Sequence, residues 1–206
     1  MVSVHRKSKG LKPNYDIVFK MITPNSSVLD LGCGDGILLK ELVDGKNVNG
    51  LGIEIDQNSV IKALEKGLQI IQGNIDEGLN DFDDKQWDFV VLNQTLQSTI
   101  KPEFVVDEML RIGKKVIVSF PNFAYWRVRF YLFFNGKMPK SKFLTFEWYN
   151  TPNIHLLTIN DFFEFCQKRN IKSDKAIYCT DGKRKKSIFR AISNFFSEEA
   201  IFLISR

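Results

Sequence analysis

Short apolar runs alternate with segments of helical periodicity from residue 27 to residue 120 of this 206-residue chain. The apolar runs are typical of buried strands, and they lie at 27–31, 48–55, 69–72, 89–92 and 116–120. Helical spacing of apolar residues is found between several of them, at 37–43, 58–66 and 102–111. Strands that alternate with helices in this way predict βαβ crossovers and a parallel sheet.

Residues that begin or end helices support these boundaries. The pair Asp44-Gly45 predicts the end of the first helix, and Gly67 predicts the end of the second, because glycine adopts left-handed dihedral angles freely. Pro102 stands where a helix begins, since its missing N–H costs nothing in the first turn.

The alternation breaks after the fifth apolar run. Residues 121–155 are rich in aromatic side chains and arginine, and a helix capped by Thr158 then extends to about Lys168. Two β-like segments follow at 176–180 and 200–205, with a phenylalanine-rich helical piece between them. We therefore predict one α/β domain over 1–206, a doubly wound, mainly parallel seven-stranded sheet whose last strand is antiparallel, with 121–155 as an insertion after the fifth strand.

Composition and charge exclude several classes of protein. The chain has three widely spaced cysteines and two histidines, which argues against a disulfide framework and against a metal site. No apolar run approaches the ~20 residues that a membrane span requires, and no apolar segment follows the basic N-terminus. We expect a cytoplasmic protein with no membrane association.

The formal net charge is +5, and basic residues gather in Lys137–Lys142 and Lys183–Lys186, called here the two basic runs. Such runs are compatible with RNA binding. Solvated loops of a basic protein are the simpler interpretation.

A glycine loop carries the main chemical signal. The segment 28–36, VLDLGCGDG, reads as a strand that enters a turn containing Gly32, Gly34 and Gly36 before a helix. The dinucleotide fingerprint requires glycine at the sixth position of the loop, which is Ile37 here, so NAD is disfavoured. The carboxylate of Asp30 would repel a pyrophosphate, whereas it suits the cationic amino end of S-adenosylmethionine.

Polar residues follow the next strands. Glu54 closes the second strand 22 residues after Gly32, close to the ~20 expected for an acid that accepts hydrogen bonds from ribose hydroxyls. A surface acid at a strand end is the alternative. Asn74 and Asp76 follow the third strand as candidate adenine contacts, or as residues of an ordinary turn. Asn93 ends the fourth strand, where the methionine end of the cofactor or a substrate is expected.

The glycine loop resembles motif I of the class I methyltransferases. More narrowly, the chain resembles the MetW family of methionine biosynthesis proteins in several stretches, namely 74–79, 93–97, 118–123, 126–129, 136–139 and 147–155. The family usually has aspartate where this chain has Asn74. The resemblance implies binding of S-adenosylmethionine or S-adenosylhomocysteine and a role in methionine biosynthesis alongside homoserine O-acetyltransferase.

No catalytic residue can be assigned from the sequence. The chain has neither an Asn-Pro-Pro-Tyr motif nor a Pro-Cys pair, although methyl transfer can proceed by alignment alone. Two functions stay open: a partner subunit that docks on homoserine O-acetyltransferase through 121–155, and a methyltransferase acting on a small molecule or RNA. The insertion offers candidates for a substrate pocket, a docking face or an internal lid, and they are Trp126, Arg127, Arg129, Tyr149 and His155.

Overall fold

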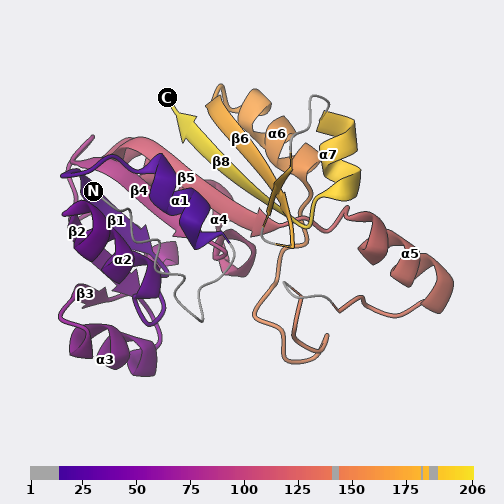
Figure 1. Cartoon of the computed structure of the whole chain (residues 1–206), viewed down its shortest axis with the longest axis horizontal. Coiled ribbons are helices and arrows are strands. Elements are labelled where there is room, and N and C mark those ends of the chain that lie inside the picture. The colour runs from indigo at the N-terminus through magenta and orange to yellow at the C-terminus, as the bar shows by residue number, and fades with distance from the viewer. Residues whose placement is uncertain (1–13, 141–143, 182, 186–189) are drawn as a thin grey trace, which may run out of the picture.

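The computed structural model describes residues 14–140, 144–181, 183–185 and 190–206, and it contains one eight-stranded sheet (Figure 1). The strand order is β3-β2-β1-β4-β5-β8-β6-β7. The strands are β1 Ser27–Leu31, β2 Asn49–Glu54, β3 Gln69–Gln72, β4 Trp87–Asn93, β5 Gly113–Pro121, β6 Lys172–Thr180, β7 Lys183–Lys185 and β8 Glu199–Ser205. The first five pair in parallel, and β8 is antiparallel to both of its neighbours, β5 and β6.

The predicted mainly parallel sheet with an antiparallel last strand is confirmed, but the predicted number of strands is one too small. Lys183–Lys185 forms the additional strand, which pairs antiparallel with the end of β6. A short strand of basic residues suits the edge of a sheet, because its charges oppose pairing with another chain. The strand expected at 176–180 also begins earlier, at Lys172, with an irregular register between Ser173 and Lys175.

Helices cover both faces of the sheet, as predicted. They are α1 Tyr15–Met21, α2 Ile37–Lys46, α3 Gln57–Glu65, α4 Pro102–Ile112, α5 Trp126–Asn135, α6 Ile159–Lys168 and α7 Arg190–Phe196, with short 3₁₀ helices η1 Ile75–Glu77 and η2 Leu96–Ser98. One core cluster joins the sheet to α4 and α6, and a second joins its other face to α1 and α2. Within the described ranges, no helix has the length and apolar character needed to cross a membrane.

Helix ends follow the local sequence with one exception. Thr158 and Asp161 form a reciprocal capping box at the start of α6, and Gly67 has a φ of 75° just after α3, as predicted. The predicted end of α2 at 44–45 is wrong, because the helix continues to Lys46. Gly45 serves packing there, since a Cβ atom on it would lie 2.9 Å from the ring of Phe19 in α1.

The insertion leaves the sheet at the end of β5. Figure 1 shows α5 beyond the end of the sheet, and the chain returns through an irregular segment to α6. We call residues 144–158 of that segment the strap. Large aromatic side chains are exposed on α5 and on the strap, among them Phe133, Phe134, Trp148 and Tyr149 at 69–79% exposure.

Candidate functional site

The glycine loop joins β1 to α2 in a conformation that depends on its glycines. Gly32, Gly34 and Gly36 have φ angles of 66°, 58° and 74°, in the left-handed region that disfavours side chains. A Cβ atom on Gly36 would lie 2.4 Å from the Leu68 side chain, so this glycine also allows close packing. Gly34 differs, because nothing lies within 4 Å of the position its Cβ would take. The loop therefore leaves open space in front of Gly34.

That space belongs to a cavity of about 160 Å³ at the carboxyl ends of β1 and β4, here the glycine-loop cavity. Its lining comes from the loop, from α1, from the start of α2 and from the two strand ends: Tyr15, Asp30, Gly32, Cys33, Gly34, Asp35, Ile37, Leu38 and Asn93. Crevices at the carboxyl ends of parallel strands are where ligands bind in open α/β sheets. Four of the residues predicted for cofactor binding thus border one cavity, and they are Asp30, Gly32, Gly34 and Asn93.

Asp30 is the buried carboxylate of this cavity. Its side chain is almost completely buried at the end of β1. Burial raises the pKa of the Cys33 thiol and of the Tyr15 hydroxyl well above their ordinary values, and the carboxylate of Asp30 raises both further. Both groups therefore stay protonated at neutral pH. Cys33 lacks the thiolate that a nucleophile needs, and its Sγ–H donates to the carbonyl of Gly34.

Glu54 binds the backbone around the glycine loop. One carboxylate oxygen accepts a hydrogen bond from the amide of Gly34 at 2.7 Å, and the other accepts from the amides of Ile55 and Asp56, each at 2.9 Å. An ionised carboxylate offers about four acceptor positions, so about one remains for a ligand hydroxyl. The second strand and the loop are also joined by backbone amides of Gly32 and Cys33, which donate to the carbonyl of Ile53.

Asn74 and Asp76, which the sequence leaves equivalent, have different surroundings. Both carboxylate oxygens of the buried Asp76 accept backbone amides, from Ile100 at 3.0 Å and from Lys101 at 2.8 Å. Asp76 therefore fixes the segment that precedes α4. Asn74 is half-buried at the end of β3, where its side-chain oxygen accepts from the amide of Asp76 at 3.1 Å.

A buried polar cluster surrounds Asn93 beside the glycine-loop cavity, and its other members were not predicted from the sequence. The side-chain oxygen of Asn93 accepts hydrogen bonds from Asn14 and Ser119. Asn14 also donates to Glu199, the first residue of β8, as does the side chain of Gln94. These residues come from four elements far apart in the chain, so no local spacing could identify them. The cluster fixes the orientation of the Asn93 amide.

The insertion residues singled out from the sequence do not line the glycine-loop cavity. Arg127 and Arg129 are exposed, and their guanidinium groups lie 5.3 Å and 5.6 Å from the ring centroids of Trp126 and Phe195. Tyr149 is exposed on the strap. His155 alone among the five lines another cavity, between α4 and α6.

Solved structures with the same fold cover nearly the whole chain. A chain of the complex between the Haloferax volcanii Trm112 methyltransferase activator and a methyltransferase matches with a TM-score of 0.66 at 15% identity, covering 94% of this chain and 88% of that one. A possible histamine N-methyltransferase from Thermotoga maritima, dependent on S-adenosylmethionine, gives 0.65 at 16% identity, covering 93% and 87%. The [4+2]-cyclase SpnF gives 0.67 at 14% identity, covering 93% and 80%. The fold is thus that of the class I methyltransferases, and the likeness shows the fold alone.

Sequence relatives are more specific. A bifunctional methionine biosynthesis protein MetXA/MetW from Rhodopirellula baltica is 34% identical over 177 residues, which is 82% of this chain and 28% of that protein. A ubiquinone biosynthesis O-methyltransferase from Klebsiella pneumoniae is 35% identical over 92 residues, 42% of this chain and 38% of that protein. The chain thus spans about a third of the length of each of these relatives. The family model described as methionine biosynthesis protein MetW matches residues 12–204, and the chain belongs to this family.

Proposed function

We propose that this protein binds S-adenosylmethionine or S-adenosylhomocysteine in the glycine-loop cavity and acts in methionine biosynthesis as a partner subunit of homoserine O-acetyltransferase. The observation that carries the partnership is the Rhodopirellula baltica relative, in which a MetXA part and a MetW part are named together in one bifunctional chain. The family resemblance implies the acetyltransferase as the partner.

The residues of the cavity fit the amino-acid end of the cofactor. The open space at Gly34 lets a ligand approach the backbone, and the buried carboxylate of Asp30 complements an ammonium group. The Asn93 oxygen already accepts two hydrogen bonds, so its NH₂ group is the donor suited to the ligand carboxylate. Gly32 and Gly36 would maintain the loop conformation around these groups.

The remaining predicted contacts lie along the next two strand ends. Glu54 keeps about one acceptor position for a ribose hydroxyl, so we assign it one hydroxyl rather than both. For adenine we favour Asn74 over Asp76, because Asp76 is buried and holds the backbone before α4, whereas Asn74 is only half-buried at the end of β3. The oxygen of Asn74 retains a lone pair for the exocyclic amino group.

The exposed aromatic side chains of the insertion support a docking face. We define the aromatic face as Phe133, Phe134, Met138, Phe146, Trp148 and Tyr149, all of them exposed. Exposed large apolar side chains are candidates for interaction sites, and tryptophan, tyrosine and arginine dominate binding energy at interfaces. Trp126 is a weaker anchor candidate than Tyr149, since it is half-buried against Tyr125 and Phe130.

The partnership is tested by mixing the purified protein with homoserine O-acetyltransferase, with and without S-adenosylmethionine, and measuring complex mass and acyl transfer. A stable complex should bury more than ~1,000 Å². The double variant Trp148→Ala/Tyr149→Ala should weaken it by ~2 kcal/mol or more, while Ile61→Ala, an exposed apolar residue on α3, should leave it unchanged. Absence of a complex together with unchanged acetyltransferase activity would reject the partnership.

Methyl transfer is the second candidate function, and the match to an O-methyltransferase over 92 residues favours it. When bound, S-adenosylmethionine supplies a methyl group on a sulfonium centre. The methyl acceptor would then be a small molecule or RNA. Of the two basic runs, Lys137 to Lys140 and Lys183 to Lys185 lie within the described residues, and Lys140 pairs with Glu147. Release of S-adenosylhomocysteine in a mixture of candidate acceptors, without the acetyltransferase, would favour this function.

A further inference from the structure

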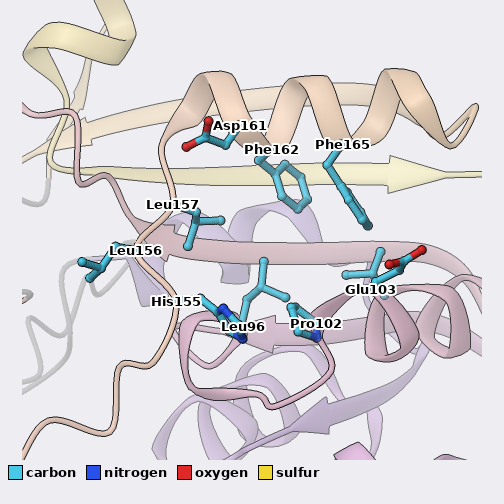
Figure 2. A pocket seen from close by; sticks show the side chains of 10 residues that line it. Leu96, Pro102, Glu103, His155, Leu156, Leu157, Asp161, Phe162 and Phe165 are labelled. Atoms are coloured by element: carbon cyan, nitrogen blue, oxygen red, sulfur yellow. The ribbon is translucent and has the colours of Figure 1, made fainter.

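A second and larger cavity of about 410 Å³ lies between α4 and α6, and it shares no lining residue with the glycine-loop cavity. Figure 2 shows Phe162 and Phe165 projecting from α6 on one side, with Leu96 and Pro102 facing them from the other. Leu157 and His155 come from the strap. The volume falls within the range of about 300–1,000 Å³ typical of small-molecule sites, whose walls are mostly apolar with few polar groups.

His155 is the polar side chain that the strap contributes to this cavity. Its Nε2 atom is buried and has no hydrogen-bond partner among the described residues. The strap fixes its position, because the backbone amides of Ile154 and His155 both donate to the carbonyl of Gln97, at 2.9 Å and 3.0 Å. Buried polar atoms are nearly always paired in native proteins, so an unpaired nitrogen on a residue that lines the cavity supports a ligand that would pair with it.

The charges around the cavity limit the class of ligand. In its described lining, the cavity has no lysine or arginine, and Figure 2 shows the carboxylates of Asp161 and Glu103 at its opposite ends. Both carboxylates are already engaged, Asp161 in the capping box with Thr158 and Glu103 with Arg169. An anionic ligand is therefore disfavoured. A hydroxyl group can pair with Nε2 in either tautomer of a neutral imidazole, since it both donates and accepts.

We propose that the cavity between α4 and α6 is a binding site for a small neutral aromatic alcohol, with its ring between the phenylalanines of α6 and Leu96 and its hydroxyl on His155. The rings of Phe162 and Phe165 lie 6.0 Å apart at 29°, and they present apolar surface suited to a flat ligand. Binding at this site requires neither the cofactor nor the acetyltransferase.

Three probes of one shape test the proposal by calorimetric titration into the full chain without cofactor: 2-naphthol, 2-methylnaphthalene and 2-naphthoate. 2-Naphthol should bind most tightly and 2-naphthoate least. His155→Phe should weaken 2-naphthol by about 2- to 12-fold, the loss of one hydrogen bond, and should leave 2-methylnaphthalene nearly unchanged. The same variant should not lower the stability of the ligand-free protein, because it removes an unpaired buried atom.

Two tryptophan variants locate the site. Leu156→Trp enlarges a partly exposed residue of the cavity wall and should abolish binding of both neutral probes. Ile154→Trp, its exposed neighbour two positions earlier, is not part of the wall and should leave binding unchanged. Absence of 2-naphthol binding, equal binding of 2-naphthoate, or equal 2-naphthol affinity of His155→Phe and wild type would each overturn the proposal. None of these results would affect the proposed cofactor site.

Discussion

Replacement of Glu54 by alanine tests the cofactor assignment most directly. In the ligand-free protein this carboxylate accepts hydrogen bonds from the amides of Gly34, Ile55 and Asp56 at 2.7–2.9 Å. Glu54→Ala therefore removes two things, the acceptor proposed for a ribose hydroxyl and the support of the glycine loop at Gly34. Both losses weaken cofactor binding, but only the loss of support at Gly34 changes the ligand-free protein.

The magnitude follows from the kind of bond that is lost. A hydrogen bond to a charged group contributes ~1.5–3 kcal/mol, which corresponds to ~10- to 150-fold in affinity. We expect Glu54→Ala to weaken S-adenosylmethionine binding by at least the lower of these values. Glu54→Gln keeps one oxygen acceptor and removes the charge, so its loss of affinity should be smaller than that of alanine.

Calorimetric titration of S-adenosylmethionine and S-adenosylhomocysteine measures these affinities, and chemical denaturation follows the stability of each variant. Asp56→Ala is the matched control, because Asp56 caps α3 through the amide of Ser59 at 2.8 Å. Its loss should lower stability by about 0.5–2 kcal/mol without changing cofactor affinity. Equal affinity of wild type and Glu54→Ala would remove Glu54 from the site, and tighter binding of NAD would refute the cofactor assignment.

Three further predictions concern stability and RNA. Gly36→Ala places a Cβ atom against Leu68 at a φ of 74°, so we expect a loss of ~1–2 kcal/mol and a Tm lower by roughly 2–8 °C in calorimetry. Arg111 holds the pKa of Glu108 below its ordinary value. The ion pair therefore stabilises the fold above about pH 4.5, and this stabilisation disappears as the pH falls through the lowered, folded-state pKa of Glu108. In urea titrations, Glu108→Gln should lose less stability than wild type between about pH 7 and about pH 3.5. If the two basic runs contact phosphates, the logarithm of the RNA association constant should fall with the logarithm of the salt concentration, at a slope of about −0.7 per phosphate contact. Absence of RNA binding at low salt would exclude RNA as the methyl acceptor.

Although β3 is largely exposed, the other four of the first five strands could be predicted because most of their residues are buried, and burial leaves an apolar run in the sequence. Val90, Val91 and Leu92 of β4 are completely buried, for example, between helices on the two faces. The handedness of βαβ connections restricts the possible orders of these strands, and the observed order reverses between β1 and β4.

Elements that depend on contacts with distant parts of the chain have no such apolar run in the sequence. β7 exists through backbone pairing with β6 at three positions, and its side chains carry no alternation of apolar residues. α1 has seven residues and no side-chain cap, and it is stabilised by packing of Val18 and Ile22 against the sheet. The end of α2 was misplaced because Gly45 serves contact with Phe19 rather than termination.

The candidate site was predictable only as far as it is local in sequence. The glycine loop and Glu54 have a fixed spacing, so their proximity follows from the strand–loop–helix unit. Asn74 and Asp76 could not be distinguished, because the amides that Asp76 binds belong to a segment 24 and 25 residues further along the chain. The polar cluster around Asn93 draws on residues as distant as Glu199, and nothing in local spacing identifies it.

Residues 93–97 connect the two cavities. Asn93 lines the glycine-loop cavity, and Gln94, which has a left-handed φ of 59°, accepts a hydrogen bond on its carbonyl from the side chain of Gln97 at 2.7 Å. Gln97 in turn holds the strap at His155 through its own carbonyl. A ligand that displaces Asn93 would therefore act on the position of His155. If saturating S-adenosylhomocysteine changes the affinity for 2-naphthol, 2-naphthol must change cofactor affinity by the same factor, because linkage between two binding sites is reciprocal. Independent titrations, with no change in either affinity, would show that the Gln97 connection is rigid and transmits nothing between the cavities.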